Sequence, residues 1–428
     1  MRDMRRVVLA SFIGATFEWF DFALYGSSAA VVFNVLFFPE VNPLLGTLAA
    51  FATGALGYIT RPLGGILFGH FGDRLGRKSM LVTTMLIMGI STVAIGVLPT
   101  YTAIGVGAPV ILLILRMLQG IGLGGEYAGA ALATIESAPE RRRGFFGSLP
   151  QVGNPAGGLL ATLLVGAFSA LPEDAYLSWG WRVPFLLSAV LLGVGLYVRI
   201  SLTETADFAE VRAEGATERF PLLEVLRRYR RNFALAFGSR VVDAVAGNLY
   251  NAIGVAYLVT TLGLPRSTGL FATSAAMAVQ IFYMPLVGRY SDRIGRRRLY
   301  LIGVAVTGLF SFPFFLLLDT RSTVLIWLAM IVGLAIGSGT EFAVQSTLMT
   351  EMFPARVRYT ALSLVYQLSA VIGGLTPVAA TYLLLVADGR PWLVAGALLV
   401  VAAISFACTL GLRRIAEPAP DPVLEERR

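Results

Sequence analysis

Segments of about 20 consecutive apolar residues recur along almost the whole chain, and this pattern restricts the fold more than any other feature. A helix needs about 20 such residues to cross the hydrocarbon core of a bilayer. Of the 428 residues, 56% are hydrophobic and only 14% are charged, whereas a typical soluble domain has about 25% charged residues. We therefore predict an all-α integral membrane protein with twelve transmembrane helices. The predicted spans are 7–37, 46–68, 80–98, 108–135, 145–170, 181–200, 232–262, 267–288, 299–318, 323–350, 359–386 and 391–412.

Basic connections alternate with nearly neutral ones along the chain. The basic connections precede span one, follow spans two, four, eight and ten, and follow span twelve. Each intervening connection has at most one arginine: Arg182, Arg266, Arg321 or Arg390. By the positive-inside rule, the basic connections and both termini lie in the cytoplasm. Topology thus accounts for the net charge of +8, and we predict no nucleic-acid partner.

Two motifs occur twice, and their spacing indicates an internal repeat. The segment 69–78 (GHFGDRLGRK) reappears as 288–297 (GRYSDRIGRR), with the aspartates 219 positions apart. The segment 136–143 (ESAPERRR) reappears as 351–358 (EMFPARVR), 215 positions later. Each copy follows an even-numbered span, so the two halves share one orientation in the membrane. This is the parallel repeat expected of a transporter with two bundles and a site between them.

The longest polar stretch divides the chain near its middle. We predict a first six-helix bundle at 1–200, a cytoplasmic linker at 201–231, a second six-helix bundle at 232–415 and a disordered tail at 416–428. The linker contains a basic amphipathic helix at 221–231. This helix either lies at the membrane interface or is a solvated linker helix.

The repeated motifs resemble signatures of a large transporter family. The pattern Gly-x-x-x-Asp-Arg-x-Gly-Arg-Lys/Arg is similar to the best-known signature of the major facilitator superfamily. Residues 18–26, 61–74, 116–126 and 178–185 resemble its metabolite:proton symporter family, which includes permeases for shikimate, α-ketoglutarate, citrate and proline or betaine. Within that family, residues 41–53 and Arg240–Asp243 are most similar to shikimate-type transporters.

The resemblance implies a major facilitator fold, with a central cavity lined by spans one, four, seven and ten. It also implies that charge pairs at the cytoplasmic rim hold the two bundles together in one state. The expected gate residues are Asp73, Arg74, Arg77, Asp292, Arg293 and Arg296. We expect Asp73 just past the end of span two, with Gly72 and Gly76 allowing a tight turn. Plain positive-inside anchoring is the alternative, but it does not explain the two aspartates.

Strong charges within the predicted spans occur on spans one, four, seven and ten. Each costs at least about 2.5 kcal/mol at a helix centre, so several together indicate a polar cavity or ion pairing. We predict proton coupling by Asp21, Glu18 and Glu126. We predict substrate binding by Arg116, Gln119, Arg240, Asp243, Tyr25, Glu341 and Gln345. Glu18, Asp21 and Tyr25 share one helical face, which we expect to line the cavity. The alternative is that Arg116 and Arg240 form structural ion pairs with carboxylates.

No cofactor or metal is predicted. Residues 120–125 (GIGLGG) match the G-x-G-x-x-G nucleotide pattern but lie within an apolar span with no preceding strand. We interpret Gly120 and Gly124 as a close helix–helix contact. The P-loop pattern of ATP-driven proteins does not occur, and Cys408 is the only cysteine, so neither a disulfide framework nor a cysteine metal site is expected.

The leading hypothesis for function is proton-coupled uptake of a small organic solute across the inner membrane by alternating access. We expect a carboxylate such as shikimate or a related acid, and a monomer whose partners are the solute, protons and lipid. Uptake of a zwitterion such as proline or betaine, proton-coupled export and a non-transporting solute receptor are the alternatives. Residues 153–158 (GNPAGG) partly resemble the glycine-proline motif of drug antiporters. No nucleophile–base pair is visible, so an enzyme is not expected.

The charge alternation predicts the location of each connection. Reporter fusions after Pro43, Pro172 and Asp388 should be external. Fusions after Lys78, Arg143 and Arg428 should be cytoplasmic. A firm reversal at any one of these positions would rule out the predicted topology.

Overall fold

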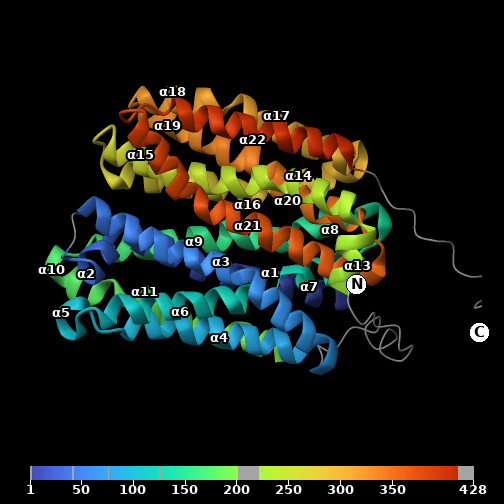
Figure 1. The fold of residues 1–428 in the computed structure, drawn as a ribbon, viewed down its shortest axis with the longest axis horizontal. Coiled ribbons are helices and arrows are strands. Elements are labelled where there is room, and N and C mark those ends of the chain that lie inside the picture. Colours follow the sequence, from blue (N-terminus) through green and yellow to red (C-terminus); the bar gives the residue numbers. More distant parts are fainter. Residues whose placement is uncertain (1, 41–42, 76, 125–126, 201–220, 413–428) are drawn as a thin grey trace, which may run out of the picture.

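The computed structural model describes residues 2–40, 43–75, 77–124, 127–200 and 221–412. The side chains of residues 69–81 also lie outside this description. Within the described ranges every regular element is a helix and no strand occurs. The helices form two layers that run side by side, with α1–α11 in the first half and α13–α22 in the second (Figure 1).

The elements of the first half follow the predicted spans closely. They are α1 (Arg2–Ser28), η1 (Ala29–Phe33), α2 (Asn34–Phe37), α3 (Pro43–Leu75), α4 (Arg77–Val97), α5 (Tyr101–Ile104), α6 (Gly107–Gly124), α7 (Tyr127–Glu136), η2 (Glu140–Arg142), α8 (Arg143–Ser148), η3 (Pro150–Val152), α9 (Gly153–Ser169), α10 (Glu173–Ala175), η4 (Tyr176–Gly180) and α11 (Arg182–Ile200).

The second half repeats this order. Its elements are α13 (Pro221–Arg228), α14 (Arg230–Asn248), η5 (Leu249–Ile253), α15 (Gly254–Thr260), α16 (Arg266–Ile294), α17 (Arg296–Leu309), α18 (Ser311–Asp319), α19 (Thr323–Met330), η6 (Ile331–Ser338), α20 (Gly339–Thr350), α21 (Ala355–Val386) and α22 (Trp392–Gly411). The π-helical turns η1 and η5 lie at matching places in the first helix of each half.

Eight helices in the described part of the chain are long and apolar enough to cross a membrane. A ninth crossing is formed by α17 and α18, which are bent by 45° at their junction. The remaining predicted spans correspond to α1 with α2, α3 and α4. The prediction of an all-α membrane protein with twelve spans is therefore confirmed.

The repeated rim motif is more helical than predicted. Gly72 and Asp73 lie within α3, which continues to Leu75, so the expectation of a turn at Gly72 is wrong. In the second copy Asp292 lies within α16, and the chain turns at Gly295, where φ is +99°. The helix continues past the apolar span because its backbone N–H and C=O groups need hydrogen-bond partners, and helical hydrogen bonds supply them.

The linker segment at 221–231 forms a helix, α13, followed directly by α14. Val225 is fully buried in the apolar core of the second half, whereas Leu223 and Leu226 are exposed. The predicted linker residues 201–220 and the predicted tail 416–428 lie outside the described residues.

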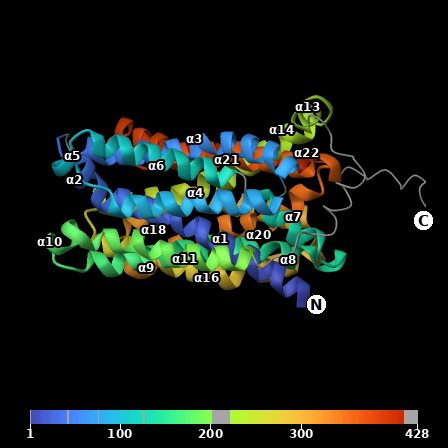
Figure 2. The ribbon, with the colours of Figure 1, turned by 90° about the horizontal axis from the view of Figure 1, so that it is seen from below.

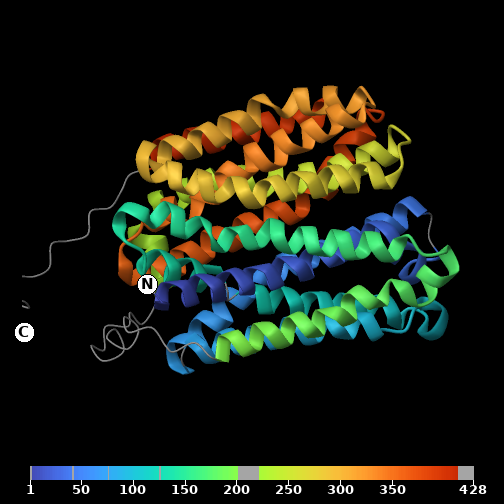
Figure 3. The ribbon, with the colours of Figure 1, turned by 180° about the vertical axis from the view of Figure 1, so that it is seen from behind.

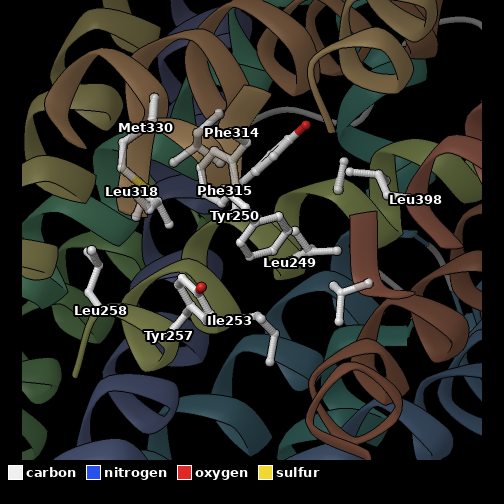
Figure 4. Packing of buried hydrophobic residues seen from close by; sticks show 14 of the residues in the cluster. Leu249, Tyr250, Ile253, Tyr257, Leu258, Phe314, Phe315, Leu318, Met330 and Leu398 are labelled. Atoms are coloured by element: carbon white, nitrogen blue, oxygen red, sulfur yellow. The ribbon is translucent and has the colours of Figure 1, made fainter. Parts of the chain in front are cut away.

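Each half has its own apolar core. In the first half, aromatic rings of Phe33, Phe37, Trp181 and Phe185 pack against one another. In the second half, the ring of Tyr250 packs against Phe314 and that of Tyr257 against Phe315; Figure 4 shows the cluster that contains them. Two smaller clusters join the halves, one including Leu132 and the other Val152.

Glycines bring α3 and α6 into close contact, as predicted for Gly120 and Gly124. A Cβ atom on Gly120 would lie 2.0 Å from the carbonyl oxygen of Gly57, and one on Gly124 would lie 2.0 Å from that of Arg61. Gly64 on the opposing helix would place a Cβ 1.9 Å from the carbonyl oxygen of Ile121. Small residues thus fix the spacing of these two helices.

The two halves meet along α3 with α21 and along α9 with α16 (Figures 2 and 3). They also meet at the end of the molecule where α1 begins. There the Asp292 carboxylate accepts hydrogen bonds from the main-chain N–H groups of Gly144, at 2.8 Å, and Phe145, at 3.0 Å. Arg358 of α21 forms an ion pair with Glu136 of α7 at 3.4 Å.

Main chain approaches main chain at this junction. A Cβ on Gly144 would lie 2.6 Å from the carbonyl oxygen of Gly288 and 2.7 Å from the Asp292 carboxylate. Arg296 pairs with Asp292 at 3.4 Å and also with Glu351, which holds the carboxylate in place from within its own half. We refer to Gly144, Phe145, Gly288, Asp292 and Arg296 as the rim contact.

A Gly144→Ala substitution should open the rim contact. The added methyl group would overpack the junction, which costs about 1–3 kcal/mol. About 1.4 kcal/mol already changes the ratio of closed to open rim contact tenfold. Spin labels at the exposed positions Arg141 and Arg293 should report longer distances in this variant. The control is Gly166→Ala on α9, where a Cβ meets nothing within 4 Å. Unchanged label distances in Gly144→Ala would contradict this account of the contact.

Candidate functional site

A cavity of about 360 Å³ lies between the two halves. It extends from Trp19 and Tyr366 toward Thr260 and Arg266, which are exposed at the end opposite the rim contact. The cavity is therefore reached from one end, while the rim contact joins the halves at the other. Its volume is in the range of sites that bind small organic molecules.

Two buried arginines from different halves line this cavity. Arg61 comes from α3 and Arg240 from α14, and their exposed fractions are 1% and 4%. The guanidinium carbon of Arg61 lies 4.0 Å from the ring centre of Phe22 and 4.3 Å from that of Tyr58. Within the described residues its Nε and Nη2 atoms have no hydrogen-bond partner. Guanidinium donors form strong hydrogen bonds with anions.

Arg240 is held on several sides within the second half. Its guanidinium lies 3.9 Å from the ring centre of Tyr366, pairs with Asp243 at 3.7 Å and donates a hydrogen bond to Ser369. Ser338 donates to the other Asp243 oxygen at 3.3 Å. Arg240 and Asp243 thus line the cavity, as predicted, and also form the ion pair that was the alternative interpretation.

The charged face of α1 does not line the cavity. Trp19, Phe22, Ala23 and Gly26 do so, whereas Asp21 is buried within the first half. Glu18 and Tyr25 are buried too and are absent from the lining. The expectation that this face lines the cavity is wrong. Successive residues of a helix are about 100° apart, so the residues that follow Glu18, Asp21 and Tyr25 face a different direction. The shared face at i, i+3 and i+7 exists, but it is turned about one residue away from the cavity.

A chain of hydrogen bonds links Asp21 to Arg116 across three helices. Thr92 on α4 donates to Asp21 Oδ2 at 2.6 Å, and Gln119 Nε2 donates to Thr92 Oγ1 at 2.6 Å. Arg116 Nη1 in turn donates to Gln119 Oε1 at 3.2 Å. The second carboxylate oxygen of Asp21, Oδ1, has no partner in the described structure. This chain contains one group that can exchange a proton and one fixed cation.

Arg116 lies behind the cavity wall rather than in it. Its guanidinium is 3.9 Å from the ring centre of Phe22 and 4.1 Å from that of Tyr25. Phe22 lines the cavity and contacts both Arg116 and Arg61. The Phe22 ring therefore lies between Arg61, which lines the cavity, and Arg116, which is hydrogen-bonded through Gln119 and Thr92 to Asp21.

Two other residues predicted to bind substrate also lie outside the cavity. Gln345 lies near Arg240 beside a much smaller void. Glu341 has no exposed surface and accepts a hydrogen bond from Thr307 on α17 at 2.7 Å. The face of α20 that carries Glu341 packs against α17 because Gly303 leaves room there, with the Glu341 Cγ 3.0 Å from a Cβ built on that glycine.

Some predicted site residues lie outside what the structure describes. Glu126 is one, and the side chains of Asp73, Arg74 and Arg77 are others. In the second copy of the motif, Asp292 and Arg296 take part in the rim contact and Arg293 is exposed. Across the described ranges no group of three or more metal-ligating side chains comes together.

Sequence reasoning missed Arg61 and Thr92. Arg61 lies in a motif that carried the family resemblance. It is also a charged residue within an apolar span, and this alone indicates a functional residue. Thr92 has no charge, and a single threonine in an apolar span gives no such signal. The cavity amides Asn154, Asn248, Asn251 and Gln280 were also missed.

Comparison with known proteins gives one consistent result. Residues 7–220 match the family model for sugar (and other) transporters, and residues 235–428 match that of the major facilitator superfamily. The shikimate transporter of Escherichia coli (strain K12) is 42% identical over 373 residues, covering 86% of this chain and 85% of the relative. The proline/betaine transporter of the same organism is 35% identical over 390 residues, covering 89% of this chain and 78% of the relative.

Solved structures agree with the fold. The proton:xylose symporter XylE, bound to 6-bromo-6-deoxy-D-glucose, aligns with a TM-score of 0.76 at 19% identity, covering 96% of this chain and 95% of that one. Its fold is the two-bundle arrangement described above. With these family matches over both halves, the chain belongs to the major facilitator superfamily, whose members here are membrane transporters and not enzymes.

Proposed function

We propose that this chain is a proton-coupled uptake transporter for a small hydroxylated carboxylate such as shikimate. One observation carries the proposal: Arg61 and Arg240, from different halves, line one cavity, and two buried donors of Arg61 have no hydrogen-bond partner in the described structure. A carboxylate bound between two guanidinium groups would bridge the two halves. The identity to the Escherichia coli shikimate transporter supports the same substrate class.

The amide groups around the arginines suit the rest of such a substrate. Asn154, Asn248, Asn251 and Gln280 line the cavity from both halves. Amides both donate and accept hydrogen bonds and therefore match hydroxyl groups. Trp19, Tyr58 and Tyr366 provide flat apolar surface against which a ring can lie.

In this proposal the proton binds in the first half of the chain. Asp21 can exchange a proton, and Thr92, Gln119 and Arg116 connect it to the aromatic wall of the cavity. An anion and a proton that cross together carry little net charge, which lowers the free energy of the crossing. Binding at Arg61 would act on Arg116 through the electric field across Phe22.

The distribution of arginines gives the orientation of the protein in the membrane. With the basic connections in the cytoplasm, the rim contact closes the cytoplasmic end and the cavity opens to the outside. The conformation is then the one that receives substrate for uptake. We further propose an inner-membrane location, both termini in the cytoplasm, and a monomer as the working unit, as in transporters whose site lies between two bundles of one chain.

A zwitterion is the second candidate substrate. Asp243 lines the cavity beside Arg240, so the site also offers an acceptor for a cationic group. The proline/betaine transporter of Escherichia coli is a relative. A zwitterion would place its carboxylate at the arginines and its ammonium group at Asp243.

Proteoliposomes test the proposal directly. With an inside-alkaline pH gradient, the protein should accumulate shikimate or a related acid above its external concentration, and without the gradient it should only equilibrate. Betaine, a neutral sugar and an organic cation complete the panel. Preferred accumulation of the cation, or accumulation of the acid that ignores the pH gradient, would overturn the proposal.

Arginine variants test the binding groups. Arg61→Lys and Arg240→Lys should each raise the KM for the acid about tenfold or more, because lysine lacks the forked donor geometry and about 1.4 kcal/mol corresponds to tenfold. The KM for betaine should rise as well, because its carboxylate would occupy the same arginines. Arg390→Lys, in an exposed connection, is the control and should leave KM unchanged. An unchanged KM for the acid in both lysine variants would argue against carboxylate recognition by these arginines.

A further inference from the structure

The second half holds a buried carboxyl group that the proposed mechanism does not use. Glu341 on α20 has no exposed surface, and Thr307 on α17 donates a hydrogen bond to its Oε1 at 2.7 Å. Its Oε2 has no partner within the described part of the chain. Asp21 has the same pattern, with one oxygen bonded to Thr92 at 2.6 Å and the other without a partner.

The internal repeat relates the two threonines. Thr92 and Thr307 are 215 positions apart, the same offset that separates Glu136 from Glu351 in the repeated rim motif. Each threonine lies on the third membrane-crossing helix of its half, α4 or α17. Asp21 comes from the first helix and Glu341 from the fourth. Both halves therefore use the equivalent hydroxyl to hold one oxygen of a buried carboxyl group.

The surroundings of Glu341 contain acids and no cation that pairs with it. The titratable groups that act on it are Asp243 from α14, Tyr250 from η5 and Tyr300 from its neighbour α17. Among the described residues no ion pair includes Glu341, and Arg240 pairs with Asp243 instead. Burying an ionised carboxylate without a counter-ion is strongly unfavourable, and a bound proton removes that penalty.

Glu341 is also connected to the cavity. It lies three residues after Ser338, which ends the π-helical segment η6, and both Ser338 and Leu334 of η6 line the cavity. Ser338 donates to Asp243, the partner of Arg240. A π-helical segment within a transmembrane helix is a common feature of functional sites. A ligand that recruits Arg240 would change the charge that Asp243 presents to Glu341.

We propose that Glu341, held by Thr307, is a second proton-binding site of the transport cycle, located in the C-terminal half. In one state Oε2 of the carboxylate takes up a proton from water, which forms an O–H bond and leaves the side chain neutral while the halves move. In the opposite state the same O–H bond breaks and the proton returns to water. This inference rests on the proposed proton-coupled transport and extends it to two carboxyl groups, one in each half.

The number of protons per substrate is the first readout. In proteoliposomes with the membrane potential clamped at zero, the logarithm of the accumulation ratio is measured against the imposed pH difference. The slope gives the protons carried per substrate, and it should fall by about one in Glu341→Gln. Glu140→Gln, which removes an exposed carboxyl group, is the control and should keep the wild-type slope. A wild-type slope in Glu341→Gln would overturn the inference.

Infrared difference spectroscopy provides a readout that does not require transport. A protonated Glu341 should give a carboxyl C=O stretching band in the wild type that responds to pH, persists in Asp21→Asn and disappears in Glu341→Gln. If Glu341→Gln does not fold, Thr307→Val should shift the pH dependence of the band, and Thr307→Ser should restore it. A band that is insensitive to both positions would overturn the inference. A wild-type protein that shows the band but no pH-driven accumulation would instead contradict the proposed function.

Discussion

Two guanidinium groups, those of Arg61 and Arg240, are enclosed in the middle of a bundle of apolar helices. Charges at this depth are tolerated only when they face other protein groups or a water-filled cavity. Each is placed against an aromatic ring, Arg61 against Phe22 and Tyr58 and Arg240 against Tyr366. These contacts are electrostatically favourable, but they leave donors of Arg61 unpaired. In the proposed function, an anion in the cavity would pair with these donors.

The two ends of the molecule are held in opposite ways. At one end Gly144 and Gly288 bring main chain against main chain, and Asp292 bonds the N–H groups of Gly144 and Phe145. At the other end the cavity reaches the exposed residues Thr260 and Arg266. A substrate that draws Arg61 and Arg240 together would favour closing the open end, and closing both ends at once would strain the rim contact. In the proposed transport cycle, this opposition would let one cavity open to either side of the membrane in turn.

The sequence predicted the fold in detail because the signals of a membrane bundle are local. Apolar length defined the spans, arginines defined their direction, and the repeat defined two halves. The site was predicted only in part. Arg240 and Asp243 line the cavity as expected, but Asp21, Arg116 and Glu341 lie behind its wall. Which face of α1 meets the cavity depends on a rotation of about one residue, and that rotation is set by packing between helices distant in sequence. Thr92 and Thr307 carry no charge, yet their spacing of 215 positions is a signal that the repeat made available.

The central claim is that the proton and the substrate bind to different groups, Asp21 on one side of Phe22 and Arg61 with Arg240 on the other. Asp21→Asn separates the two roles, because asparagine keeps the size of the side chain and cannot exchange a proton. The most direct measurement compares substrate exchange between preloaded vesicles with accumulation driven by a pH gradient, in the same preparation of this variant. The account predicts that exchange continues while the accumulation driven by the pH gradient falls, by about one proton per substrate. Accumulation against a concentration gradient with an unchanged pH dependence would contradict it.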